Sequence, residues 1–365
     1  MSSLSGTDPP IPLIEQSYPV GAVKSLTPIN YPQIGVVTGE EEINVWRVET
    51  GLGAFCLKRH RPSKSLARAV FEEQFQGVIY EAAAHLVAAP LSTNNGSSGV
   101  TSGSNRFRME RLIPSSHYIW WRGGWGTNVC YAAGRGLFDF HEAAMAGLHS
   151  QTLKSCCTGS QEAQRFLVEA PHEKIYESCI GSLDGVKRKI SQSDLGNVHC
   201  EWKPCIDEYE TLLFHSQQAI GSLPPTAAQD CRIVHGDYHP GNTLLAQDRL
   251  AAIVDFEDVR VESWLYDLAY ALIMFCTRWQ AEEDDRNSTD NEARAAFLNG
   301  YLEGTHYALN REGELSTYTL IACALISGWL LERFALFAGA DVTFHDKDLL
   351  KCLKRIQRVW DTALS

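Results

Sequence analysis

Alternation of apolar and polar residues in the first third of the chain predicts a small sheet with one helix. Two runs of β-forming residues flank a glycine turn within residues 43–59, which predicts a hairpin. Apolar residues recur at helical spacing over residues 65–87, so a helix should follow. Residues 92–105 consist mainly of Ser, Asn, Gly and Thr, which predicts an exposed, mobile loop between two strands. Residues 107–113 alternate like a strand that ends at Pro114.

Helical periodicity dominates the remainder of the chain. We expect helices over residues 132–148, 207–222, 264–278, 292–303 and 315–338, and two short apolar strands over 232–234 and 251–254. The pattern therefore predicts an α+β protein of two lobes. Residues 1–18 would be a flexible lead-in, 19–113 a small β-rich lobe that binds nucleotide, and 114–365 a larger, mainly α-helical lobe that carries catalysis and substrate binding.

Composition and charge exclude some classes of binding partner. The 365 residues are 44% hydrophobic and 21% charged, which is ordinary globular usage. The net charge of −12 repels phosphate backbones and anionic membranes, so neither a nucleic acid nor a membrane is an expected partner. The eleven cysteines, without a paired CxxC arrangement, resemble reduced core thiols. No signal peptide and no uncharged stretch long enough to span a bilayer is recognisable, which favours the cytoplasm.

Two polar clusters follow the two short strands of the second lobe. The first reads HGDYHPGN at residues 235–242, and the second reads DFED at residues 255–258. Phosphoryl transfer needs an aligned acceptor hydroxyl and neutralised phosphate charge, and Mg²⁺ prefers oxygen ligands. We expect Asp237 to orient and deprotonate the acceptor hydroxyl, and Asn242 and Asp255 to hold Mg²⁺. His235 should brace the loop by hydrogen bonding.

These motifs resemble those of a known family. HGDYHPGN, IVDFED and WLYDLA, in this order, look like the motifs of the aminoglycoside phosphotransferase and choline kinase-like family, whose relatives include homoserine, spore-coat and stress-response kinases. The resemblance implies a protein-kinase-like two-lobe fold that uses ATP and Mg²⁺. It gives Asp237 the role of catalytic base and Asn242 and Asp255 that of metal ligands. It also implies that Asp267 anchors the catalytic loop from the following helix.

The same resemblance assigns nucleotide contacts in the first lobe. Lys58 matches the lysine that contacts the α- and β-phosphates, and a glutamate on the next helix should pair with it. We expect Glu73 in that role, with Glu72 as the alternative. Residues 109–112 fall where backbone groups would meet adenine, with Glu110 and Leu112 as the contacts.

Several features depart from the kinase pattern. A glycine-rich phosphate loop is absent, and residues 37–44 are acidic instead. DFED replaces DFG, so we expect no DFG-type switch, and Glu257 and Asp258 become candidates for the acceptor site. The acidic run at residues 282–285 is either solvated surface or an attractor for a cationic amine.

The sequence thus predicts transfer of the γ-phosphate of ATP to a hydroxyl of a small polar acceptor, with an amine-bearing acceptor as one option. The alternatives are a Ser/Thr protein kinase of the stress-response type and a catalytically silent kinase-like module that binds nucleotide. Specificity in such folds lies in variable loops, so the acceptor, the choice between ATP and GTP, and the oligomeric state do not follow from the sequence.

Overall fold

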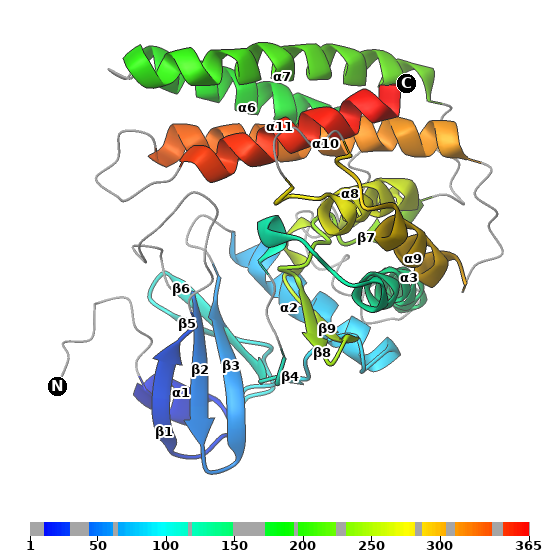
Figure 1. Cartoon of the computed structure of the whole chain (residues 1–365). Coiled ribbons are helices and arrows are strands. Elements are labelled where there is room, and N and C mark those ends of the chain that lie inside the picture. Colours follow the sequence, from blue (N-terminus) through cyan, green and yellow to red (C-terminus); the bar gives the residue numbers. More distant parts are fainter. Residues whose placement is uncertain are drawn as a thin grey trace.

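The fold has a small sheet lobe below a larger helical lobe (Figure 1). The computed structural model describes residues 11–29, 44–60, 65–115, 119–148, 172–192, 196–223, 231–281, 287–303, 311–337 and 346–364. The predicted two-lobe α+β architecture is confirmed. The lobe boundary at residues 113 and 114 stays a prediction.

A six-stranded antiparallel sheet forms the first lobe. Its order is β1-β2-β3-β6-β4, and β5 also pairs with β6. The strands are β1 (Val23–Pro28), β2 (Val45–Thr50), β3 (Gly53–Arg59), β4 (Pro90–Leu91), β5 (Val100–Ser102) and β6 (Asn105–Arg111). The predicted hairpin is β2–β3, with Val45 opposite Lys58.

A short helix precedes the sheet where we expected a flexible lead-in over residues 1–18. Helix α1 (Ile11–Ser17) buries Ile14 against the sheet, next to Tyr18 and Trp46. The Tyr18 hydroxyl donates to the carbonyl of Phe107 at 3.1 Å. The expected lead-in is therefore too long, because residues 11–18 contribute apolar side chains to the core of the sheet lobe.

The Ser- and Gly-rich segment also differs from the expected loose loop. Its residues Val100–Ser102 form β5 on the edge of β6. A side chain at Gly99 would lie 2.6 Å from both the Glu73 carboxylate and the Phe107 carbonyl, so the backbone is closely packed there. The polar side chains of this segment therefore form buried hydrogen bonds as well as contacts with solvent.

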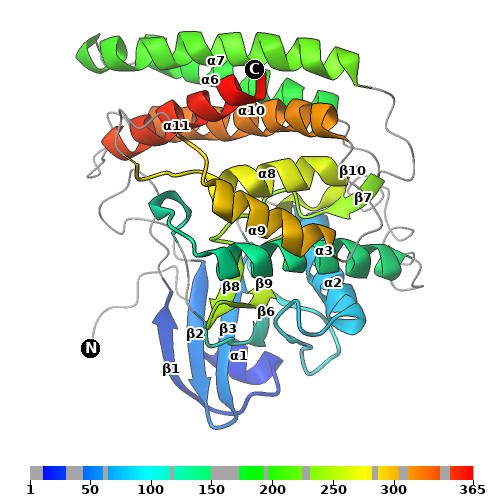
Figure 2. The same cartoon turned by 45° about the vertical axis from the view of Figure 1, so that its right-hand side comes forward.

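Helix α2 (Leu66–Ala82) joins the lobes. Ser65 caps it by accepting from the backbone N–H of Arg68, as Ser does at many helix starts. Its apolar side, with Phe71 and Phe75, belongs to the core of the helical lobe. Its polar side, with Glu72, is buried as well. Figures 1 and 2 both place α2 between the sheet and the helices.

Most predicted helices of the second lobe are confirmed, and α6 and α11 are additional. The elements are η1 (Trp120–Arg122), α3 (Thr127–Leu148), α6 (His172–Gln192), α7 (Gly196–Ser222), α8 (Trp264–Cys276), α9 (Asn291–Leu302), α10 (Glu312–Phe337) and α11 (Asp346–Leu364). Helices α6, α7, α10 and α11 form the layer farthest from the sheet (Figure 2).

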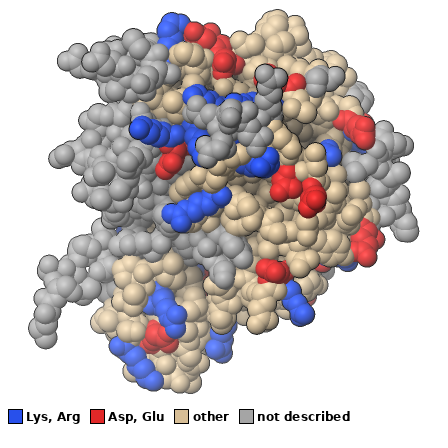
Figure 3. Space-filling model, in the orientation of Figure 1, with Lys and Arg blue, Asp and Glu red and all other residues tan. Residues whose placement is uncertain are grey.

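One helix in the described part of the chain, Glu312–Leu336 within α10, is long and apolar enough to cross a membrane. Its apolar window is 61% buried in the protein, as in the core helix of a globular lobe. Cys276 and Cys323 are buried free thiols, and the six other cysteines that the structure describes are also free. Charged side chains of both signs are interspersed on the face in Figure 3, so the acidic excess is not gathered in one patch there.

Four short strands carry the two polar motifs. Strands β7 (Cys231–Val234) and β10 (Arg260–Ser263) pair, and so do β8 (Thr243–Ala246) and β9 (Arg249–Ile253). Both views place β8 and β9 between the sheet and α8 (Figures 1 and 2). The predicted strands correspond to β7 and β9.

Candidate active site

The loop between β7 and β8 is a tight turn fixed by its own polar groups. The N–H of Asn242 donates to the carbonyl of His239 at 2.9 Å, and that of Gly241 donates to the His239 ring at 2.9 Å. Gly236 has a φ of +83°, and a Cβ there would lie 2.3 Å from the carbonyl oxygen of Asp258. Only glycine combines this conformation with so close an approach to the second motif.

Asp267 anchors the start of this loop from the first turn of α8. It is fully buried, and its two carboxylate oxygens accept the N–H groups of His235 at 2.7 Å and Gly236 at 2.9 Å. His141 of α3 lies 3.1 Å from the same carboxylate. Burial opposes ionisation, yet the hydrogen bonds from His141 and from the His235 backbone lower the pKa of Asp267. The geometry is the one that we expected of this residue.

His235 links the two motifs as a neutral imidazole. Burial lowers its pKa. Its Nε2 lies 3.1 Å from the carbonyl of Val254, and its Nδ1 accepts the N–H of Asp237 at 3.4 Å. The ring therefore donates on one side and accepts on the other, which matches the expected bracing role.

The Asp237 carboxylate is held from three directions. Its Oδ1 accepts from the Tyr270 hydroxyl at 2.5 Å, and its Oδ2 accepts from Asn242 Nδ2 at 3.0 Å. His239 Nε2 lies 3.4 Å from Oδ2. Although burial opposes it, the charge and hydrogen bond of His239 and the hydrogen bond of Tyr270 lower the pKa of Asp237. The group is thus an oriented, ionised carboxylate at neutral pH.

The Tyr270 hydrogen bond yields a test. Tyr270→Phe removes a donor that favours the charged carboxylate, so the pKa of Asp237 should rise. The acid limb of the pH profile of phosphoryl transfer should then move to higher pH, while activity on the plateau stays within about tenfold of wild type. An acid limb at the wild-type position would show that Tyr270 does not tune this carboxylate.

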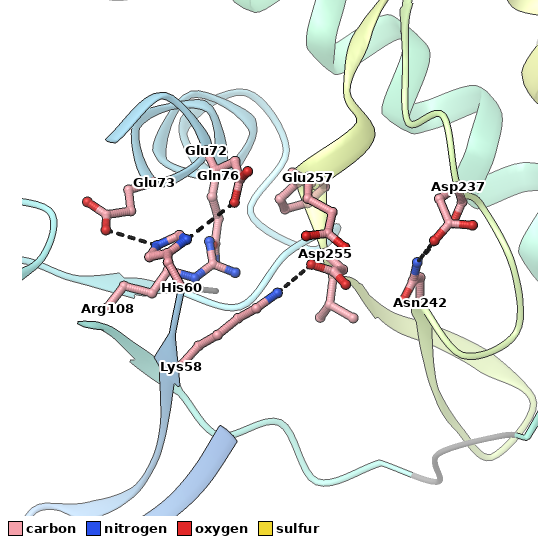
Figure 4. Close-up of polar contacts among 12 residues, drawn as sticks. Lys58, His60, Glu72, Glu73, Gln76, Arg108, Asp237, Asn242, Asp255 and Glu257 are labelled. Atoms are coloured by element: carbon pink, nitrogen blue, oxygen red, sulfur yellow. Dashed lines mark hydrogen bonds and ion pairs between the residues drawn. The ribbon is translucent and has the colours of Figure 1, made fainter. Parts of the chain in front are cut away.

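Asp255 and Lys58 meet between the two lobes (Figure 4). Lys58, near the end of β3, forms an ion pair with Asp255 Oδ1. Asp255 follows β9 with a φ of +67°, a left-handed conformation that Asp adopts more readily than most residues. The N–H of Val254 donates to the carbonyl of Asn242 at 2.9 Å, so the two expected metal ligands lie on hydrogen-bonded neighbouring segments.

These side chains fit a magnesium ion that is shared with a nucleotide. Asn242 and Asp255 offer oxygen ligands on neighbouring segments, and Lys58 brings a cation beside them. Among the described residues, no group of three or more His, Cys, Asp and Glu could hold a metal alone. Magnesium sites of kinases typically use one or two protein oxygens together with substrate phosphates, so this donor set is sufficient.

Asp258 lies beside the expected metal ligands in an acidic environment. The surrounding protein and the charges of Asp237 and Glu257 raise the pKa of Asp258 to about 7, although the residue is exposed at the surface. The nearby Arg260 opposes this shift and donates to the Asp258 carbonyl at 3.1 Å. Asp258 is therefore protonated more easily than an ordinary carboxyl group.

Two expected nucleotide contacts need correction. Glu73 does not pair with Lys58, because its carboxylate is bound by His60, Ser98 and Arg106. The contact of Leu112 with adenine stays a prediction: its N–H donates to the carbonyl of Ala54 at 3.2 Å, and the contact would use its carbonyl.

Glu110 is likewise engaged inside the sheet lobe. Its backbone pairs with Cys56 of β3 and with Pro90 of β4, and its side chain accepts from Gln76 at 2.6 Å. Strand pairing on both sides of β6 thus removes the free hinge groups that we expected at this position.

Three residues near the motifs were not predicted to contact the site, although His141 was expected to be a core or cap residue. Tyr270 lies on α8, His141 lies on α3, and Arg68 donates from α2 to the carbonyls that follow Asp255. The only available signal was helical spacing: Tyr270 lies three residues after Asp267, on the same side of α8. The acidic run 282–285 and most of residues 37–44 lie outside the described residues.

Comparison with known proteins decides the family. The family model described as "Phosphotransferase enzyme family" matches residues 36–308. The chain belongs to this family. The match includes both polar motifs, Lys58 and Asp267, so the predicted relationship is confirmed and the chain is a small-molecule kinase by family. A search of curated proteins gives no match.

Solved structures of other phosphotransferases have a similar fold. A spectinomycin phosphotransferase in complex with ADP and spectinomycin has a TM-score of 0.63 at 13% identity, covering 97% of this chain and 96% of its own. An amicoumacin kinase in complex with AMP-PNP and Ca²⁺ has a TM-score of 0.59 at 16% identity, covering 92% and 90%. A microcompartment-associated aminopropanol kinase has a TM-score of 0.55 at 15% identity, covering 97% and 95%. At these low sequence identities, the similarity shows that the fold is shared and shows nothing further.

Proposed function

We propose that this phosphotransferase moves the γ-phosphate of ATP, with Mg²⁺, to a hydroxyl of a small polar acceptor. The observation that carries the proposal is the Asp237 carboxylate, which Tyr270 and Asn242 orient beside the segment that bears Asp255 and its partner Lys58. An oriented base, oxygen ligands and a facing cation are the parts that phosphoryl transfer requires.

In this proposal each residue has one task. Asp237 aligns the acceptor hydroxyl and accepts its proton as the new O–P bond forms and the bond to the leaving ADP breaks. Asn242 and Asp255 would hold Mg²⁺, which neutralises phosphate charge. Lys58 contacts the α- and β-phosphates, while His235 and Asp267 keep the loop in place.

An amine-bearing acceptor fits the electrostatics best. Asp258, whose pKa is raised to about 7 by its surroundings, lies beside Asp237 and Glu257, and an ammonium group next to it would favour its charged form. One protein of similar fold is named an aminopropanol kinase, which agrees with an amino alcohol. The free cysteines in the described part of the chain fit a reducing compartment, and we place the enzyme in the cytoplasm.

A screen of amines, amino alcohols, sugars and aminoglycosides for acceptor-dependent ADP release tests the function. We expect turnover with at least one amine-bearing hydroxyl compound, and none without Mg²⁺. Radiolabelled ATP incubated with protein substrates is the parallel arm. Labelled Ser or Thr without any small-molecule turnover would favour a protein kinase. Stabilisation by ATP with no phosphorylated acceptor in either arm would favour a silent nucleotide-binding module.

A further inference from the structure

Two adjacent carboxylates on α2 are buried beneath the sheet. Glu72 and Glu73 are 2% and 4% exposed, where an unpaired charge would be very costly. Arg106 binds Glu73 through two nitrogens, at 2.8 and 2.5 Å, and Ser98 donates to it at 2.6 Å. Burial would raise the pKa of Glu73, yet hydrogen bonds from His60, Arg106 and Ser98 lower it. Glu73 is therefore a buried anion with fixed partners, and the buried Glu72 lies next to it on the helix.

His60 lies between these carboxylates (Figure 4). Its Nε2 is 3.1 Å from Glu73 Oε1, and its Nδ1 is 3.4 Å from Glu72 Oε2. The backbone N–H of His60 donates to the carbonyl of Arg106 at 2.9 Å, which continues the β3–β6 ladder by one residue. The imidazole thus fastens the polar side of α2 to the end of β3.

Lys58 precedes His60 by two positions, so the two side chains leave the strand on the same side. They then diverge. His60 turns to the α2 carboxylates, while Lys58 reaches across to Asp255 (Figure 4). The end of β3 therefore contacts α2 through the His60 side chain and the second lobe through the Lys58 side chain.

The first turn of α2 holds the other end of this connection. Arg68 Nη2 donates to the carbonyls of Glu257 at 2.5 Å and Val259 at 3.2 Å, within the turn that follows Asp255. Arg68 Nε lies 3.3 Å from Glu72 Oε1. Helix α2 is thus attached to β3 at Glu73, which His60 Nε2 contacts, and to the backbone beside Asp255 at Arg68, while Glu72 lies between His60 and Arg68.

The apolar side of α2 contacts the second motif. Phe75 packs edge-on against Phe256 of the DFED motif, with ring centres 5.6 Å apart, and Phe256 stacks on Phe140 of α3. The apolar side of α2 belongs to the core of the helical lobe, and its polar side contacts the end of the strand that carries Lys58. Helix α2 is therefore packed between the strand of Lys58 and the turn that follows Asp255.

We propose that His60 and Arg68 are positioning residues that make α2 a brace between Lys58 and Asp255. The brace takes the place of a direct ion pair between Lys58 and an α2 glutamate. It leaves the lysine ammonium available to Asp255 and to phosphate. This inference rests on the proposed function, because it concerns how the same site receives a nucleotide.

Calorimetric titration of the full-length protein with Mg²⁺ and ADP tests the brace. His60→Gln and Arg68→Met should each weaken ADP binding by about five- to tenfold, a usual range for contacting groups. In the Lys58→Met background each of the two substitutions should weaken ADP binding by less than about twofold, because the lysine that His60 and Arg68 position is absent. Arg47→Gln is the matched control, since it breaks only the exposed Arg47–Glu49 pair on β2 and should leave affinity unchanged in both backgrounds.

The outcomes separate the two proposals. A wild-type protein that binds no ADP would refute the proposed function and remove the basis of the brace. Wild-type ADP binding with unaltered affinity in both variants, or with equal losses with and without Lys58, would overturn the brace alone. Circular dichroism checks folding. If His60→Gln does not fold, Arg68→Met decides alone, because this substitution leaves His60, Ser98 and Arg106 bound to Glu73.

Discussion

Asp237→Asn should lower phosphoryl transfer by about 10²- to 10⁴-fold, the usual contribution of a positioned general base. The carboxamide is nearly isosteric and its oxygen can still accept from Tyr270; its NH₂ group would face the Asn242 amide, but the loop keeps its backbone hydrogen bond from Asn242 to His239. It cannot accept the proton of the acceptor hydroxyl at neutral pH. Binding of Mg²⁺ and ADP should therefore persist while turnover is lost, as measured by calorimetry and by acceptor-dependent ADP release.

Asp248→Asn is the matched control for this substitution. Asp248 lies in the exposed turn between β8 and β9, and the same chemical change there should leave turnover at the wild-type level. Asp237→Asn activity within tenfold of wild type would show that another group accepts the proton. Loss of ADP binding together with turnover would show instead that the residue maintains the nucleotide site.

The positions of the two polar motifs were predictable because each motif follows a short apolar strand. Asp237, Asn242 and Asp255 lie in segments of only a few residues, whose backbone hydrogen bonds bring them together. The role of Asp267 followed from the family resemblance alone, and in the structure its buried carboxylate accepts two loop N–H groups. Local spacing and elementary ligand chemistry therefore indicate Asp237, Asn242 and Asp255, whereas they give no sign of Asp267.

The partner of Lys58 was not predictable from spacing. Glu73 has the helical position expected of a lysine partner, but Arg106, His60 and Ser98 compete for it. Arg106 lies 33 residues after Glu73, and no local sequence pattern predicts a contact over this separation. Likewise, the free backbone expected at Glu110 is engaged, because this residue pairs with Cys56 of β3 and with Pro90 of β4.

Segments with weak local patterns were missed for a related reason. Helix α1 has only 7 residues and begins close to three prolines, so its single buried Ile14 gives no periodic signal. Strand β10 (Arg260–Ser263) is polar because it pairs only with β7 and carries the charged side chains of Arg260 and Glu262. Tertiary contacts, and not the intrinsic propensity of the residues, determine whether such short helices and strands form.

Asp267→Asn should lower the free energy of unfolding by about 3–5 kcal/mol, the range for removing one partner of a buried charged pair. The wild-type carboxylate accepts from His235 N, Gly236 N and His141 Nε2 without any exposure to solvent. A carboxamide would turn an NH₂ group toward at least one of these donors. Urea unfolding measures the loss, and Asp207→Asn, in an exposed pair with Lys203, should change stability by less than about 1 kcal/mol.

The pH dependence of this loss has a definite sign. The pKa of Asp267 is lowered in the folded protein, so its charged form stabilises the fold above the ordinary carboxyl pKa of about 4. As pH falls through the lowered folded pKa, wild type loses that contribution, whereas the carboxamide does not titrate. The stability gap between wild type and Asp267→Asn should therefore be full near pH 7 and shrink in acid. A gap that stays constant or widens as pH falls would show that the charge of Asp267 does not hold the catalytic loop.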